Sequence, residues 1–119
     1  MNETIKLKRG TDGRAKLDRL VAKHVMRWTI YEDWSDTLYY YSVDTGATGL
    51  EVDRWKPSAD MNDAMRVYLN FQTRRMFQEK NSGYYIRFAD DLKGVYHANL
   101  PVAICLAALR AKGVDVEIV

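Results

Sequence analysis

The sequence has little that would cross-link it, anchor it in a membrane or charge it strongly. Its 119 residues include one cysteine, two prolines and a net charge of +2. A single cysteine excludes a disulfide within the chain. The apolar run at 102–109 is far shorter than the ~20 residues that span a bilayer, and no N-terminal segment resembles a signal peptide. We therefore expect a cytoplasmic protein with no membrane partner.

The small net charge also argues against a nucleic-acid partner. A duplex-binding protein usually has a basic face or arm, whereas here Lys and Arg are interleaved with Asp and Glu. The densest basic cluster, residues 6–9, is interpreted as a solvated lead-in, with a nucleic-acid arm as the alternative. We expect no DNA or RNA partner, a flexible lead-in at 1–12 and a single domain at 13–119.

Few side chains are suited to catalysis or metal binding. His24 and His97 fall on different predicted elements, and no His, Cys or carboxylate set has zinc-ligand spacing. Cys105 lies inside the apolar run and is interpreted as a small buried hydrophobe. Asp60 and Asp63 can be an acid–base pair, but helix capping also explains them. We therefore expect no catalytic residues, no metal, no cofactor and a protein that is not an enzyme.

Hydrophobic periodicity and turn residues divide the chain into alternating helices and hairpins. Helical spacing predicts helices at 12 or 13 to 27, from Ser58 or Asp60 to about 77–80, and at 100–112. Alternating patterns predict strands at 29–34, 37–44, 84–88, 95–98 and 114–118, with a short one at 50–55 after a loop at 45–49. Turns are predicted at 81–83 and 90–94.

This order predicts an α+β protein, an α/β/α sandwich with a roughly five-stranded, mainly antiparallel sheet and three helices. The helix at 100–112 is apolar on every side, so it must be covered by the sheet and by another helix or another subunit. A homo-oligomer is therefore expected, with Val102, Leu106 and Leu109 as candidate interface residues.

Three motifs resemble the phage ABA-sandwich domain family. They read LDRLVA at 17–22 followed by VMRW at 25–28, KPSADMNDA at 56–64, and LPVAICLAAL at 100–109. The resemblance implies a bacteriophage or prophage origin and an antiparallel sheet between helices, and it brings no catalytic residues with it.

The layout also resembles, more loosely, the oligomeric sponges that bind and sequester nucleotide immune signals such as cyclic ADP-ribose derivatives or cyclic oligonucleotides. Small phage proteins often act against host immunity, so this likeness implies an anti-defence role in the cytoplasm of an infected bacterium. It is an analogy of layout.

Aromatic and basic residues are the candidate binding groups. The chain has eight tyrosines and three tryptophans. Aromatic stacking combined with guanidinium contacts to phosphate is the chemistry that holds a nucleotide. The candidate ligand-binding residues are Tyr39, Tyr41, Arg54, Arg74, Arg75, Tyr85 and Arg87. The N-termini of the second and third helices offer further anion contacts. The alternative is that the tyrosines serve the strands and the arginines an interface.

The sequence therefore predicts a non-enzymatic, oligomeric protein that binds and sequesters a nucleotide-like small molecule. The alternative is an oligomeric protein–protein interaction module that inhibits or adapts a host protein.

Overall fold

A computed structural model describes residues 4–79, 83–89 and 91–119. Along the chain these form β1 (Thr4–Leu7), α1 (Thr11–His24), β2 (Trp28–Glu32), β3 (Leu38–Ser42), β4 (Gly46–Glu51), the 3-10 turn η1 (Val52–Arg54), α2 (Met61–Tyr68), β5 (Arg74–Glu79), β6 (Gly83–Phe88), β7 (Val95–His97), α3 (Leu100–Ala111) and β8 (Asp115–Ile118). The α+β class is confirmed. The predicted turn at 81–83 lies mostly outside the described residues, as does Asp90 of the turn at 90–94.

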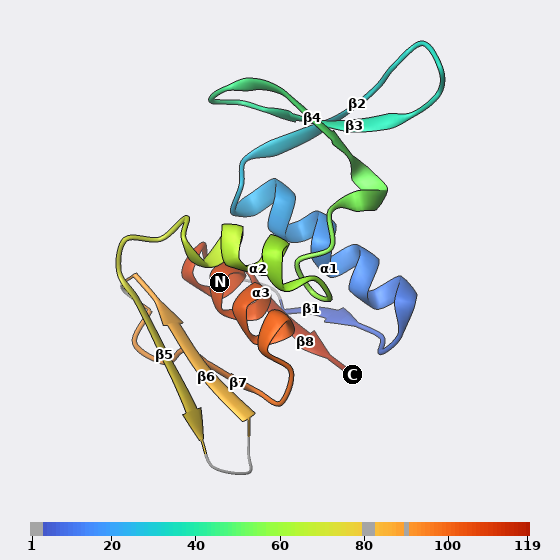
Figure 1. The fold of residues 1–119 in the computed structure, drawn as a ribbon. Helices are drawn as coiled ribbons and strands as arrows, with labels where there is room; N and C mark the ends of the chain where they lie inside the picture. The colour runs from blue at the N-terminus through green and yellow to red at the C-terminus, as the bar shows by residue number, and fades with distance from the viewer. Residues whose placement is uncertain (1–3, 80–82, 90) are drawn as a thin grey trace.

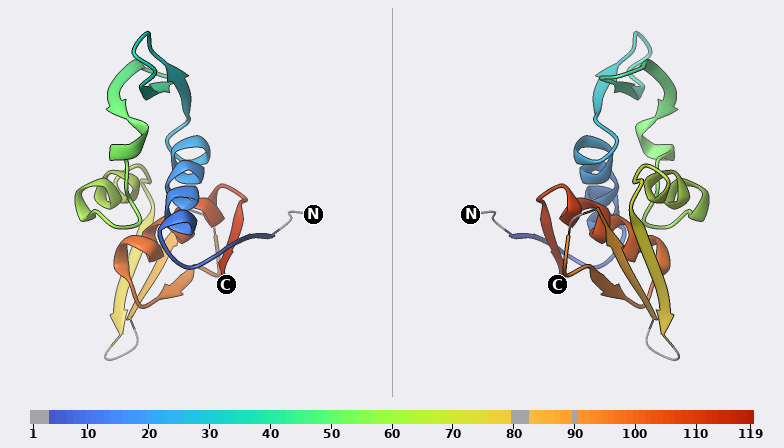
Figure 2. Two further views of the ribbon diagram at one scale, coloured as in Figure 1. Left: turned by 90° about the vertical axis from the view of Figure 1, so that its right-hand side faces the viewer. Right: turned by 90° about the vertical axis from the view of Figure 1, so that its left-hand side faces the viewer.

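The described strands form three small sheets. Strands β2–β3–β4 and β5–β6–β7 are antiparallel sheets, and β1 pairs with β8 in parallel. The prediction of one five-stranded sheet is therefore wrong. The two three-stranded sheets lie at opposite ends of the molecule with the helices between them, so their edges never meet (Figures 1 and 2). This arrangement makes the chain elongated, 49 × 32 × 30 Å along its principal axes.

Helix α3 is the centre of the core. It contacts α1, α2, β6, β7 and β8, and seven of its twelve residues are buried. Asn99 caps it by accepting a hydrogen bond from the Val102 N–H at 3.1 Å, and Pro101 occupies the first turn. The predicted burial of Cys105 is confirmed. Because the chain itself buries most of α3, with Leu106 half-buried, this helix does not require a partner subunit.

Strand β1 lies within the segment predicted as a lead-in without structure of its own. Ile5 pairs with Val116 and Leu7 with Ile118, and Leu7 is only 6% exposed. The parallel pairing brings together the two ends of the described chain (Figure 1). A strand whose partner is more than 100 residues away has no local turn to reveal it, although the alternation of Ile5 and Leu7 with lysines is a strand pattern.

Helix α2 is shorter than predicted. It ends at Tyr68, and Arg74–Glu79 is strand β5, so the predicted helix to 77–80 is wrong. Phe71 explains the break, because its buried ring stacks on Phe88 at 4.3 Å and draws the chain into the core. Strand β6 then supplies the backbone partners for β5. The predicted loop at 45–49 is likewise mostly strand, because β4 begins at Gly46.

Two of the sequence motifs meet in the interior. The buried carboxylate of Asp18, in α1, accepts a hydrogen bond from the Ser58 N–H at 2.8 Å. Two residues further on, the Asp60 carboxylate accepts from the N–H groups of Asn62 (2.7 Å) and Asp63 (3.2 Å) and so caps α2. This confirms the capping interpretation of Asp60. The motifs therefore fix α2 against α1.

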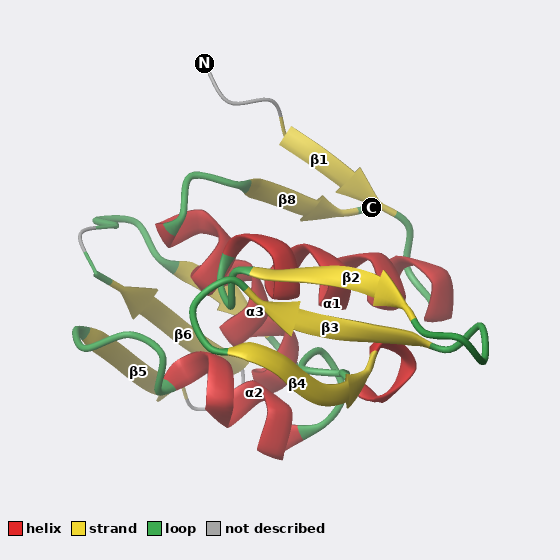
Figure 3. Ribbon diagram, turned by 90° about the horizontal axis from the view of Figure 1, so that it is seen from above, coloured by secondary structure: helices red, strands yellow, loops and turns green. Residues whose placement is uncertain are grey.

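Three aromatic rings attach the β2–β4 sheet to the helices. Trp28 lies 5.3 Å from Tyr40 and 4.7 Å from Trp55, and all three side chains are buried. The Arg66 guanidinium lies 5.5 Å from the centre of the Trp28 ring and 5.4 Å from that of Trp55. Seen from above, this sheet lies over the helices, with the β1–β8 pair beside it (Figure 3).

Candidate functional site

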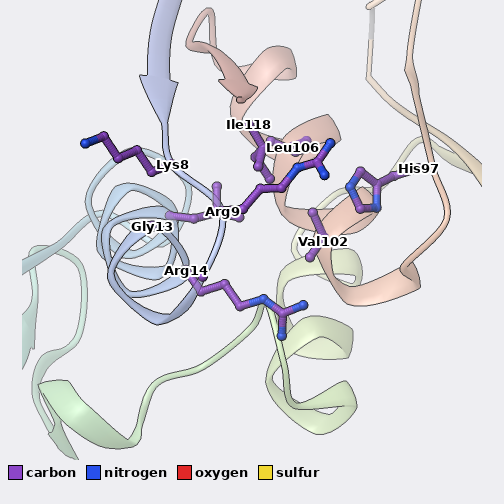
Figure 4. A pocket seen from close by; sticks show the side chains of 10 residues that line it. Lys8, Arg9, Gly13, Arg14, His97, Val102, Leu106 and Ile118 are labelled. Carbon is purple, nitrogen blue, oxygen red and sulfur yellow. The ribbon is translucent and has the colours of Figure 1, made fainter.

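A cavity of about 530 Å³ lies where the β1–α1 connection, β7, α3 and β8 come together (Figure 4). We call it the basic pocket. Arg9 and Arg14 contribute guanidinium groups to its lining and His97 an imidazole, whereas the side chain of the lining residue Lys8 points away from them (Figure 4). Its volume falls within the range of small-molecule sites.

The rest of the basic pocket is apolar or backbone. Leu17 of α1, Val102 and Leu106 of α3 and Ile118 of β8 supply aliphatic side chains. No carboxylate lines the pocket within the described chain. The pocket therefore combines several positive charges with a hydrophobic wall, as a ligand with an anionic group and an apolar ring would require.

Two glycines shape the mouth of this pocket. At Gly13, a Cβ would lie 1.7 Å from the Lys8 carbonyl oxygen, so the connection can cross the helix this closely only where there is no side chain. Gly10 has a φ of 110°, which side-chain-bearing residues rarely adopt. These two positions hold the Lys8–Arg9 backbone against the first turn of α1.

The start of α1 differs from the starts of the other two helices. Gly10 precedes α1 and gives it no side-chain cap, whereas Asp60 and Asn99 cap α2 and α3. The prediction that the second and third helices present free N-termini is therefore wrong, because their own caps accept those N–H groups. Asp12 lies in the first turn of α1 but does not line the pocket. The N–H groups at the start of α1 place a positive partial charge beside the pocket, which Gly10 and Gly13 line.

The cations of the pocket are not neutralised by pairing. Within the described chain, Lys8, Arg9 and Arg14 form no ion pair. The Nδ1 atom of His97 accepts a hydrogen bond from the Asn99 N–H at 3.0 Å. This bond leaves Nε2 as the protonated, donating nitrogen of the neutral ring. Figure 4 shows the Arg9 guanidinium and the His97 ring approaching each other across the pocket.

None of the seven predicted ligand-binding residues lines the basic pocket. Tyr39, Tyr41 and Arg54 belong to the β2–β4 end of the molecule. Tyr39 and Tyr41 lie on the face of β3 that also contacts Tyr31, with ring centres 5.8 and 6.4 Å from it. Arg54 forms an exposed ion pair with Glu51 at 3.6 Å.

The other four predicted residues lie on the β5–β7 sheet at the opposite end (Figure 1). Arg75 is paired in register with Arg87. Tyr85 lies two residues before Arg87 on β6, so its side chain is on the same face of the sheet. Arg74 lies on the other face, where its Nη1 donates to the Phe71 carbonyl at 2.6 Å. The structure therefore brings Arg75, Tyr85 and Arg87 together but separates them from the tyrosines of β3.

The predicted interface residues are part of the core instead. Val102 is 2% exposed and Leu109 is fully buried, so neither can contact a second subunit in this fold. Leu106 is half-buried and lines the basic pocket. The prediction for Val102 and Leu109 is therefore wrong, because helices and sheets of the same chain already cover them.

Sequence reasoning missed Lys8, Arg9, Arg14 and His97. The first two were recognised as a basic cluster but interpreted as solvated. Their proximity to His97 depends on the β1–β8 pairing, which no local pattern reveals. The available signal was the glycine at position 13 inside an otherwise good helix pattern, since such a glycine usually has a packing reason.

Two further absences concern the described residues. No group of three or more His, Cys, Asp or Glu side chains among them is arranged to hold a metal ion. In the same part of the chain, the longest apolar helix falls short of the length needed to cross a bilayer.

Comparison with known proteins gives a family and a neighbour in fold. The model of the family described as the phage ABA sandwich domain matches residues 19–109. A crystal structure of a phage protein from Bacillus cereus ATCC 14579 superposes with a TM-score of 0.65 at 15% identity, covering 92% of this chain and 95% of that chain. At this identity the likeness concerns the fold. No curated protein matches the sequence.

Proposed function

We propose that this chain, which belongs to the phage ABA sandwich domain family, binds a small phosphate-bearing molecule in the basic pocket and holds it without converting it. The observation that carries the proposal is that the guanidinium groups of Arg9 and Arg14, neither of them in an ion pair within the described chain, belong to the lining of one cavity of about 530 Å³. Cations left without partners in a concave site are favourable for an anionic ligand and costly for a neutral one.

The pocket offers separate places for the two parts of such a ligand. Arg9 and Arg14 present planar guanidinium groups, which bind two phosphate oxygens at once. The first N–H groups of α1 add to this anion site. Leu17, Leu106 and Ile118 form the apolar wall on which a base or another flat ring would lie. A nucleotide-derived molecule fits this division.

The biological role that follows is sequestration of a nucleotide-derived immune signal. The lining supplies groups that bind and orient an anion: guanidinium groups, backbone N–H groups and an imidazole N–H. A phage protein with such a pocket would act in the cytoplasm of the infected bacterium as an anti-defence sponge. We propose that the ligand leaves the pocket chemically unchanged.

One observation favours a second function, a protein–protein interaction module that inhibits or adapts a host protein. The β2–β3 hairpin projects from one end of the molecule (Figure 2). It exposes several large apolar side chains, with Trp34 96%, Ile30 47% and Leu38 40% exposed. A cluster of exposed apolar side chains on a projection is typical of contact surfaces.

Calorimetric titration tests the proposed function. The probes are inorganic phosphate, ADP-ribose, cyclic ADP-ribose derivatives and cyclic dinucleotides. We expect one phosphate-bearing probe to bind, and Arg9→Ala or Arg14→Ala to weaken it by about ten- to a hundred-fold, which is the loss of a charged hydrogen bond of roughly 1.5–3 kcal/mol. Arg75→Ala is the matched control, because Arg75 is an exposed arginine that does not line the pocket.

Three outcomes would count against this proposal. If no probe binds at micromolar concentration, the protein–protein interaction module becomes the better-supported function. If Arg75→Ala weakens binding and the Arg9 and Arg14 variants do not, the ligand occupies the β5–β7 sheet instead. If mass spectrometry of the heat-released ligand shows a new product, the protein is an enzyme.

A further inference from the structure

The inner face of the β2–β4 sheet is only partly covered. Trp28 and Tyr40 lie on this face and are buried, at 6% and 1% exposed. Ile30 is the register partner of Tyr40 and Leu38 lies two residues before it, so both lie on the same face, yet they are 47% and 40% exposed. An apolar sheet face whose outer half is open has room for another apolar group.

A second cavity lies beside this open face. Its volume is about 520 Å³, and it is enclosed by β1, α1 and the β2–β3 strands. Ile5 and Leu7 of β1, Leu20 of α1 and Ile30 of β2 supply aliphatic walls. Tyr40 adds an aromatic ring. We call this cavity the apolar groove. None of the residues that form its walls lines the basic pocket.

The rim of the apolar groove carries positive charge only. Lys16, Arg19 and Lys23 follow one another along α1 at spacings of three and four residues, which places them on one side of the helix. All three are exposed, and none forms an ion pair within the described chain. No carboxylate is among the described residues that line the groove.

We propose that the apolar groove binds an aliphatic carboxylate, with its hydrocarbon chain against Ile30, Leu7 and Leu20 and its carboxylate among the cations of α1. The apolar walls favour a hydrocarbon chain, because burial of each methylene in an apolar site is favourable. The rim selects the charge, because unpaired cations at the mouth favour a negative head group over a neutral one. This site is separate from the basic pocket and independent of the function proposed for it.

Calorimetric titration with a series of fatty acids tests the proposal. Hexanoate, octanoate, decanoate and dodecanoate are used below their micelle concentrations, with dodecanol as the neutral probe of equal chain length. We expect affinity to rise about four-fold with each added methylene until the groove is filled, the factor that corresponds to ~0.8 kcal/mol. Dodecanol binds more weakly than dodecanoate.

Substitutions at the rim and at the wall distinguish binding of the ligand's carboxylate from binding of its hydrocarbon chain. Lys16→Ala combined with Lys23→Ala weakens dodecanoate by roughly ten-fold, as expected for two exposed ion pairs, and leaves dodecanol unchanged. Ile30→Glu weakens both probes, because it replaces an apolar wall with a charged side chain, and it weakens dodecanoate further by repelling the carboxylate. Ile30→Trp fills the groove without adding charge and serves if the glutamate variant does not fold. Lys6→Ala is the control, since Lys6 lies on β1 but does not line the groove.

Three results would overturn the proposal. The first is the absence of saturable binding for every member of the series. The second is dodecanoate binding that neither Ile30 variant weakens. The third is an oligomer, seen by sedimentation velocity, that the Ile30 variants dissociate, because a second copy of the chain would then cover the face. None of these results bears on the basic pocket, whose probes and variants are different.

Discussion

Asp18 is a carboxylate that the fold removes from water. Its carboxylate is 6% exposed and bonded to the Ser58 N–H. Burial raises the pKa of Asp18 to about 6, and the Ser58 hydrogen bond opposes this rise only in part. The folded protein therefore holds a proton on Asp18 at a pH at which the unfolded chain, with a pKa of 3.8, has already released it.

This shift makes stability depend on pH in a definite direction. The folded state holds the Asp18 proton more tightly than the unfolded chain does. The stability that this gives the folded state is therefore fully present below pH 4 and is lost as the pH rises through about 6. Asp18→Asn keeps the acceptor for Ser58 and removes the charge. We expect the variant to gain up to about 3 kcal/mol in free energy of unfolding relative to wild type between pH 4 and pH 8.

Urea unfolding at several pH values measures this difference. Asp53→Asn is the control, because Asp53 is an exposed carboxylate that lines, together with Asp18, a small cavity of about 210 Å³ between α1 and η1. A difference between Asp18→Asn and wild type that stays constant from pH 4 to pH 8 would show that Asp18 is ionised in the folded protein throughout this range.

The connection between β1 and α1 is the structural element that builds the basic pocket. In an ordinary helix, Gly→Ala stabilises by roughly 0.5–1 kcal/mol. At position 13 the added Cβ would lie 1.7 Å from the Lys8 carbonyl oxygen. We therefore expect the opposite sign, a loss of about 2 kcal/mol in free energy of unfolding, because the connection must move away.

Chemical denaturation of Gly13→Ala checks this sign. Ala15→Gly, at an exposed position of the same helix, calibrates helix propensity and should cost about 1 kcal/mol. The Gly13 variant should also lose affinity for the phosphate-bearing probe, since Lys8 and Arg9 would be displaced. A Gly13→Ala variant that is as stable as wild type would show that the connection is not held against α1.

The elements that the sequence predicted well are those whose signals are local. The helix at 100–112 was located to within a residue, because Asn99, Pro101 and Gly113 mark its ends. Elements defined by distant partners were missed. Strand β5 follows helix-like spacing in the sequence, and only its pairing with β6 and the insertion of Phe71 make it a strand.

The candidate site depends on the same distant contacts, so little of it could be predicted. Arg9 comes close to His97 because β1 pairs with β8 and β8 packs on α3 (Figure 4). Residue types alone indicated phosphate chemistry but placed it on other arginines. Arg54 lies in η1, beside the β2–β4 sheet, and the other three lie on the β5–β7 sheet at the opposite end of the molecule. Neither strand spacing nor composition determines how far apart two hairpins lie.

At the scale of the whole molecule, the expected homo-oligomer stays a prediction, and its contact surface must differ from α3. The outer face of the β5–β7 sheet offers one, because Phe77, Tyr85 and Tyr96 form a row across its three strands. The ring centres are 6.2 and 5.4 Å apart, and Phe77 and Tyr96 are 55% and 50% exposed. A self-complementary face of this kind suits a two-fold dimer.

We expect sedimentation velocity to show a dimer at tens of micromolar and the double variant Phe77→Ser, Tyr96→Ser to be a monomer. Both side chains are about half exposed, so their replacement should disturb the interface more than the fold. Trp34→Ser is the control, because Trp34 is 96% exposed on the hairpin at the other end of the molecule and should leave the dimer intact. Dissociation by Trp34→Ser alone would move the interface to that hairpin. A wild-type protein of about 14 kDa at these concentrations would show that the chain is a monomer, so that any ligand must be bound by the residues of a single basic pocket.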